Sequence, residues 1–172
     1  MDRPLKIAFD IAGDIQTELP QYLKPPAEGF KSDTDQIIPL SYVRNTRGYI
    51  EKLANQINGC YERGWFDACA VMMRRLCEVL IIEVYEAKGI SANIKDGSGN
   101  YFMMEALIKS VTTEPSWTLN RFTKRGLPKI ADAGNLSAHS IRYNAHINDI
   151  DPLISDLHVV IQDLLGLAGI KK

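Results

Sequence analysis

Residues 68–89, ACAVMMRRLCEVLIIEVYEAKG, are the most apolar stretch of the chain. Hydrophobic residues run through it almost without interruption for more than about five helical turns, which is typical of a helix buried on most of its sides. Its methionine, leucine and alanine content argues against a strand. Gly89 follows Lys88 and suits the left-handed conformation that ends many helices. The sequence therefore predicts a central helix on which the rest of the fold packs.

Apolar residues recur at helical spacing on both sides of this segment. Upstream, the pattern predicts a helix that begins near residues 45–46 and ends at Gly64. Downstream, it predicts a short helix over 102–111, one within 116–125, one opened by Pro128, and a last one with Asp151 as N-cap and Pro152 in its first turn. The expected fold is a single all-α domain, an up-and-down bundle of four to five main helices.

The first 45 residues differ from the rest. Residues 1–19 carry apolar residues at helical spacing, whereas residues 20–39 contain four prolines, which prevent regular backbone hydrogen bonding. We expect residues 1–45 to form an N-terminal helix or an extended proline-rich arm that packs on the bundle or on a partner, and residues 46–172 to form the bundle. No signal-peptide core is present, and no apolar run approaches the roughly 18 residues of a membrane span. The expected location is cytoplasmic, without a membrane partner.

Charge and cysteine content restrict the possible partners. A formal net charge of −1 gives no general attraction for nucleic acid, so RNA binding would need a local basic patch. Cys60, Cys69 and Cys77 are odd in number, lack CxxC spacing and lie among apolar residues. This pattern predicts reduced thiols in the core and not a disulfide framework.

Two groups of charged residues stand out within the helical pattern. Arg74 and Glu78 share one stripe of the central helix, where they either pair across one turn or reach a polar groove. Arg121, Lys124 and Arg125 stand three and four residues apart and form a ridge on one helix face, a spacing that suits phosphate. The alternative for this ridge is a solvated surface near a helix C-terminus, where the helix dipole favours cations.

Residues 134–152, GNLSAHSIRYNAHINDIDP, concentrate polar groups. His139 and His146 are seven residues apart with no carboxylate at zinc-protease spacing, so we predict neither a metal nor a cofactor. A serine hydrolase lacks support because the nucleophile-elbow glycine pattern is missing. Metal-free phosphoryl chemistry on RNA would use His139 as general base and Arg142 to stabilise developing charge. The alternative is that Asn135 and His139 satisfy buried backbone groups where a helix ends.

The central helix, the GNLSAH of residues 134–139 and the final amphipathic helix together resemble the HEPN-like helical superfamily, in particular a domain-of-unknown-function branch with a GNxxAH-type motif. The resemblance covers residues 46–168. It implies a bundle of four or five helices, frequent homodimerisation, and association with toxin, antiviral or RNA-processing systems. In catalytic members it implies an arginine, then a polar residue, then a histidine. Asn135 and His139 match the last two, and Gly134 stands where the arginine is expected.

These observations lead to one preferred hypothesis and two alternatives. The chain is expected to be a homodimeric, non-catalytic module that binds RNA or a protein subunit through a polar groove. The groove would be lined by Arg74, Glu78, Arg121, Lys124, Arg125, Asn135, His139, Arg142 and His146. The first alternative is a metal-independent ribonuclease with His139 as base, in which Arg142, Arg121 or Arg74 replaces the missing arginine. The second is a protein-interaction scaffold in a defence or toxin-type system, with the proline-rich arm as the contact.

Overall fold

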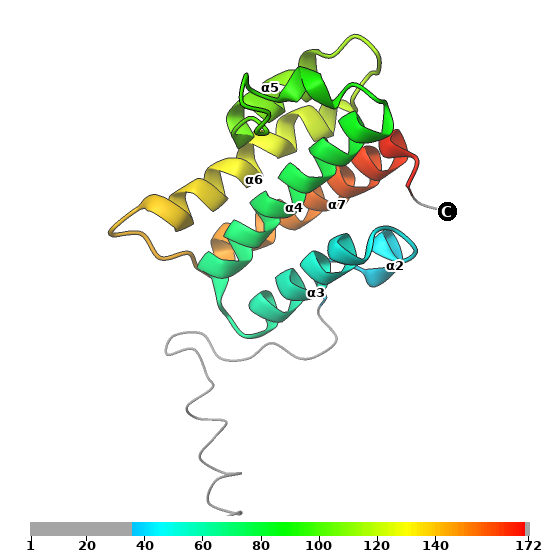
Figure 1. Ribbon diagram of the computed structural model, residues 1–172. Coiled ribbons are helices and arrows are strands. Elements are labelled where there is room, and N and C mark those ends of the chain that lie inside the picture. Colours follow the sequence, from blue (N-terminus) through cyan, green and yellow to red (C-terminus); the bar gives the residue numbers. More distant parts are fainter. Residues whose placement is uncertain (1–35, 171–172) are drawn as a thin grey trace, which may run out of the picture.

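The computed structural model describes residues 36–170, which form an all-α domain (Figure 1). This confirms the predicted fold class. The main helices are α3 (Gly48–Glu62), α4 (Phe66–Ala87), α5 (Met104–Thr113), α6 (Arg121–His139) and α7 (Ile147–Ala168), and two short elements are α2 (Leu40–Val43) and a 3-10 turn (Ser91–Ile94). The helix predicted over residues 1–19, and most of the predicted proline-rich arm, lie outside the described residues.

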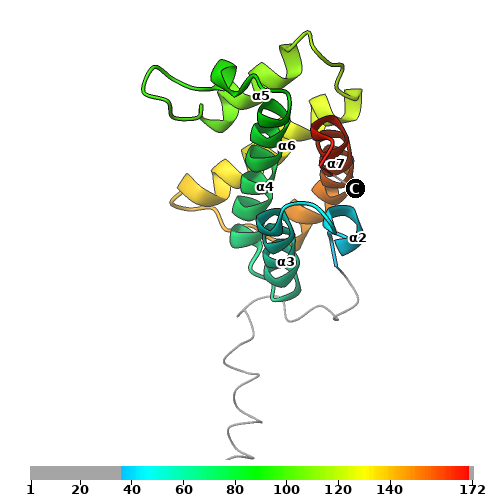
Figure 2. The same ribbon diagram turned by 45° about the vertical axis from the view of Figure 1, so that its right-hand side comes forward.

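Helix α4 lies at the centre of the domain. It packs against α3, α6 and α7, and the four long helices alternate in direction along the chain (Figure 1, Figure 2). Met73, Leu76, Leu80 and Ile81 have no exposed surface. Gly89 has a φ of 71° just after the end of the helix, as the sequence predicted. The central helix is therefore confirmed.

The three cysteines are free thiols, as predicted, but only two of them belong to the core. Cys69 and Cys77 are buried, whereas Cys60 is half-buried. Burial raises the pKa of the Cys77 thiol to about 12 and also raises the pKa of Cys69. At Cys60, burial raises the pKa and the nearby charge of Arg63 partly offsets this effect. Because the thiolate is the reactive form, Cys69 and Cys77 act as packing groups in the folded protein.

Two prolines lie inside helices and not at their starts, contrary to the sequence prediction. Helix α6 continues through Pro128, so the two helices predicted there are one, and α7 begins well before Pro152. Each proline removes one amide from the helix, which leaves the carbonyl group four residues earlier without its partner. Both prolines are exposed, and so are Lys124 and Asn148, the residues that carry these carbonyls. Water can therefore satisfy them, and the helices continue.

Helix α6 approaches its neighbours closely at two glycines. A Cβ atom on Gly134 would lie 2.5 Å from the Cβ atom of Arg74 and 3.0 Å from the carbonyl oxygen of Ala70, both in α4. A Cβ atom on Gly126 would lie 2.9 Å from the Cβ atom of Asp156 in α7. Carbon atoms in favourable contact are about 3.5–4.0 Å apart, so both crossings depend on the missing side chain.

Side-chain hydrogen bonds fix the segment before α3 to the bundle. Asn58 Oδ1 accepts a hydrogen bond from the Ile38 amide at 2.8 Å, and its Nδ2 donates one to the Ile38 carbonyl at 2.9 Å. His158 Nε2 lies 2.5 Å from the Ile37 carbonyl oxygen, and the His158 ring packs edge-on against Tyr42. Ile37 and Ile38 are buried. The described part of the predicted arm thus packs on the bundle.

Candidate functional site

Helix α6 carries most of the predicted site residues on its exposed face, opposite the face that enters the core. These residues are Arg121, Lys124, Arg125, Asn135 and His139. Arg121 and His139 are the first and last residues of the helix, which at 1.5 Å per residue separates them by about 27 Å. The single groove expected from the sequence is therefore not formed within one chain, because its residues make two groups at opposite ends of α6.

The basic cluster consists of Arg121, Lys124 and Arg125. It lies in the first turns of α6, whereas the sequence predicted it near the C-terminus of a shorter helix. Asn120 caps this end, since its Oδ1 accepts a hydrogen bond from the Phe122 amide at 2.9 Å. The guanidinium groups of Arg121 and Arg125 lie 4.8 Å and 5.3 Å from the centroid of the Phe122 ring. Phe122 is itself 38% exposed, so these two guanidinium groups lie beside an accessible aromatic surface.

No carboxylate within residues 36–170 forms an ion pair with the basic cluster. Asp163 lies at this end of the helix, but its carboxylate accepts a hydrogen bond from the Asn120 amide at 3.0 Å. The positive end of the helix dipole disfavours cations here, and like charges three or four residues apart cost about 0.2–0.5 kcal/mol per pair. The stability of the fold therefore does not account for the position of this cluster.

Arg74 and Glu78 lie at the crossing of α4 and α6. Arg74 Nη1 is 3.8 Å from Glu78 Oε2, and the stem of Arg74 packs against Gly134. Arg74 Nε is buried and has no hydrogen-bond partner among the described residues. These contacts favour the paired, structural interpretation of the two residues. They also place Arg74 beside Gly134, the residue that precedes Asn135.

Gly134 stands where the HEPN-like resemblance predicts an arginine, and its surroundings leave no space for one. Gly134 is buried and faces α4, where even a Cβ atom would be too close to Arg74 and Ala70. An arginine at this position would have no room for its side chain. The asparagine and histidine of the motif follow on the exposed face, so the motif combines a packing residue with two surface residues.

His139 and Arg142 are exposed at the end of α6 and in the loop that follows it. This loop projects from the bundle (Figure 1), and Ile141 within it is 99% exposed. The side chains of Asn135 and His139 make no hydrogen bond to any residue of the described chain. The alternative in which they satisfy buried backbone groups is therefore wrong.

His146, predicted as a binding residue, lies in the N-terminal cap of α7. Its amide donates a hydrogen bond to Asp149 Oδ2 at 2.8 Å, as in a capping box. The preceding Ala145 amide donates to Asp67 Oδ1 at 3.0 Å, which ties the loop to the start of α4. The true start of α7 is therefore set by Asp149, and not by the Asp151–Pro152 pair that the sequence suggested.

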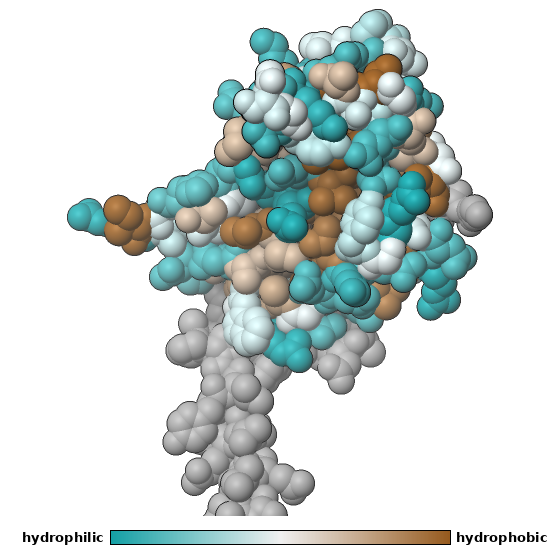
Figure 3. All heavy atoms as spheres, in the orientation of Figure 1, coloured by the Kyte–Doolittle hydropathy of each residue, from teal (hydrophilic) through white to brown (hydrophobic). Residues whose placement is uncertain are grey.

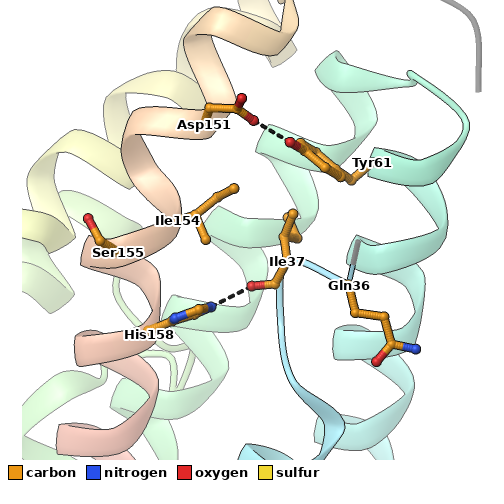
Figure 4. Close-up of a pocket in the computed structure, with 7 residues that line it drawn as sticks. All are labelled: Gln36, Ile37, Tyr61, Asp151, Ile154, Ser155 and His158. Atoms are coloured by element: carbon orange, nitrogen blue, oxygen red, sulfur yellow. Dashed lines mark hydrogen bonds between the residues drawn. The ribbon is translucent and has the colours of Figure 1, made fainter. Parts of the chain in front are cut away.

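A pocket that the sequence analysis missed lies between α3, α7 and the segment before α2 (Figure 4). It has a volume of about 610 Å³, and Tyr61, Asp151, Ser155 and His158 line it. The Tyr61 hydroxyl donates a hydrogen bond to the Asp151 carboxylate, and His158 contacts the Ile37 carbonyl. These polar groups hold helices together. In the sequence, the only indication of this pocket was the spacing of Asp151, Ser155 and His158, which places them on one face of a helix.

Within residues 36–170, no group of three or more His, Cys, Asp or Glu side chains is arranged to hold a metal ion. No helix of the described chain is long and apolar enough to cross a membrane. Comparisons of the chain with protein-family models, curated proteins and solved structures find no match. The HEPN-like resemblance therefore stays a prediction that depends on the residues alone.

Proposed function

We propose that this chain is a non-catalytic HEPN-like module that binds single-stranded RNA on the exposed face of α6. The observation that carries the proposal is the basic cluster, three cations at the positive end of α6 that form no ion pair within residues 36–170. The guanidinium groups of two of them, Arg121 and Arg125, flank the exposed Phe122 ring. Bound phosphate groups would relieve the repulsion among these cations and interact favourably with the helix dipole. Phe122 would offer a surface on which a base stacks.

The remaining exposed residues of α6 indicate which part of this face would bind the RNA strand most strongly. Asn135 and His139 continue this face toward its other end and could donate hydrogen bonds to RNA. Asp132 lies between the two groups, is also exposed and would repel phosphate. We therefore place the main electrostatic contact at the basic cluster, with weaker polar contacts beyond Asp132.

RNA binding is expected to depend on the basic cluster in a salt-sensitive way. Fluorescence anisotropy with a labelled, unstructured RNA at low ionic strength should show binding by the full chain. Replacing Arg121, Lys124 and Arg125 together by alanine should weaken it by about tenfold or more. The slope of log affinity against log salt should fall by about 2, since each lost phosphate contact contributes about 0.7 on a single strand.

The matched control replaces three exposed cations that lie outside α6, Arg44, Lys52 and Lys88, by alanine. It removes the same charge from other parts of the surface, so RNA affinity should stay within about twofold of wild type. Absence of binding by the wild type at low salt, or equal losses in the two triple variants, would contradict the proposal. If the α6 face bound a protein but not RNA, the RNA-binding proposal would be replaced by the protein-binding alternative.

The bound RNA is expected to remain intact. Gly134 occupies the position of the catalytic arginine and faces the core, so His139 has no motif arginine beside it. After incubation with chelator, denaturing gels should show the same RNA length with wild type and with His139→Ala, and the two proteins should melt at the same temperature. RNA cleavage by wild type that is lost in His139→Ala would favour the ribonuclease alternative.

A further inference from the structure

Another pocket lies between α5 and α6, at the edge of the exposed α6 face (Figure 1). It has a volume of about 330 Å³, and its apolar wall is formed by Ile108 of α5 with Pro128 and Ala131 of α6. This volume is at the lower end of the range of about 300–1,000 Å³ for small-ligand pockets. On the face shown in Figure 3, hydrophilic side chains predominate along the projecting part of α6. The pocket therefore adds a small apolar surface to a mainly hydrophilic helix.

Four polar side chains surround this apolar wall. Two are carboxylates, Glu105 and Asp132, and two can donate hydrogen bonds, Lys109 and Asn135. All four residues are exposed, and none of these side chains forms a hydrogen bond or an ion pair within the described part of the chain. An apolar wall with a few polar groups that are free to bind a ligand is typical of a small-molecule or nucleobase site.

The pocket lies on the same stripe of α6 as the basic cluster. Residues 121, 125, 128, 132 and 135 are spaced by four, three, four and three positions, so at about 100° per residue they fall within an arc of about 80°. Arg125 and Asp132 are seven residues apart, which is about 10 Å along the helix. An RNA strand whose phosphates bind the basic cluster would therefore reach the pocket within a few nucleotides.

We propose that this pocket binds a single base of the RNA and prefers guanine. The inference rests on the proposed RNA binding, to which it adds a base preference. Ionised carboxylates only accept hydrogen bonds, so Glu105 and Asp132 favour a base with neighbouring donors. Guanine presents two, at N1 and at the N2 amino group, beside the O6 acceptor to which Lys109 or Asn135 would donate. Each of the other three bases presents only one donor group on this edge.

A comparison of two RNA strands tests the base preference with the full chain. Fluorescence anisotropy would measure the Kd of a labelled oligouridine and of the same strand with one central guanine. Wild type should bind the guanine strand at least about fivefold more tightly. Glu105→Gln and Asp132→Asn should each reduce this ratio to below about twofold. Glu62→Gln, which removes a carboxylate at the end of α3, should leave it unchanged.

Asp132 is expected to have opposite effects on the phosphates and on the base. Its charge repels phosphate, so Asp132→Asn should bind oligouridine more tightly than wild type does. The same substitution weakens an acceptor for guanine, so the ratio between the two strands should fall. A purely electrostatic role of Asp132 would instead strengthen the binding of both strands equally, and this result would contradict the base pocket.

A titration with mononucleotides separates the pocket from the binding of a strand. In NMR spectra of the full chain, GMP should shift the methyl signals of Ile108 and Ala131, and its Kd should be at least about fivefold lower than those of AMP, CMP and UMP. Thermal melts would establish that the exposed carboxylate variants are folded.

The two measurements distinguish failure of this inference from failure of the proposed function. If RNA binds but the two strands have equal affinities, the guanine preference is wrong and RNA binding stands. A preference that persists in both carboxylate variants would place the guanine elsewhere and overturn the pocket. If no RNA binds but GMP shifts the pocket signals, the pocket stands and the proposed function is wrong. Absence of both responses would contradict both proposals.

Discussion

Replacing Gly134 by alanine is expected to lower the free energy of unfolding by about 2–3 kcal/mol. The added Cβ atom would lie 2.5 Å from Arg74 Cβ and 3.0 Å from the Ala70 carbonyl oxygen. Both atoms belong to the backbone of α4 or adjoin it, so relief requires a shift between two tightly packed helices. Alanine is a better helix former than glycine by about 1 kcal/mol, and this offsets only part of the loss.

Gly166→Ala is the matched control for this prediction. Gly166 also lies inside a helix, and a Cβ atom there would meet nothing within 4 Å. Its replacement should therefore stabilise the protein by about 0.5–1 kcal/mol. Urea denaturation followed by circular dichroism measures both changes. If Gly134→Ala were as stable as wild type, the close crossing of α4 and α6 would be contradicted. Gly134→Arg, which introduces the arginine of the HEPN-like pattern at this position, is expected not to fold.

Replacing Asn58 by alanine is expected to lower the free energy of unfolding by about 2–4 kcal/mol. Asn58 is only 4% exposed, and its amide group bonds both the amide and the carbonyl of Ile38. Removal of the side chain leaves two backbone groups without partners in a buried position, at about 1–3 kcal/mol each. Hydrogen exchange should show faster exchange of the Ile38 amide than in wild type.

Asn55→Ala provides the comparison on the same helix. The Asn55 side chain is exposed and donates one hydrogen bond, at 2.9 Å, to the Glu51 carbonyl of its own helix. Its loss should change stability by less than about 0.5 kcal/mol and leave exchange at Ile38 unchanged. Equal effects of the two substitutions would show that the Asn58 pairing does not hold the segment before α2.

The helical architecture was predictable because it follows from hydrophobic spacing. Residues 68–89 are apolar on nearly every side, and this alone places α4 at the centre of the domain. The errors came from Pro128 and Pro152, which were assigned to helix starts because proline is common there. Sequence alone does not reveal that both prolines lie on exposed faces, where water satisfies the carbonyls that they leave free.

The arrangement of the candidate site residues could not be predicted from the sequence. Because Pro128 divided α6 in the prediction, the basic cluster was assigned to the wrong end of a helix and to the same groove as His139. The role of Gly134 depends on α4, about 60 residues earlier in the chain, and the contact between His158 and Ile37 spans 121 residues. Such contacts leave no periodic signal, so they are known only from the structure.

The anchoring of Ile37 and Ile38 determines the smallest fragment that should fold independently. A polypeptide trimmed to residues 46–172 would lose Ile37, Ile38 and Val43 from the core, and Asn58 and His158 would lose their partners. A truncation for laboratory use should therefore retain the chain from Gln36 onward. A fusion tag joined at Gln36 would lie next to the pocket between α3 and α7, because Gln36 lines that pocket (Figure 4).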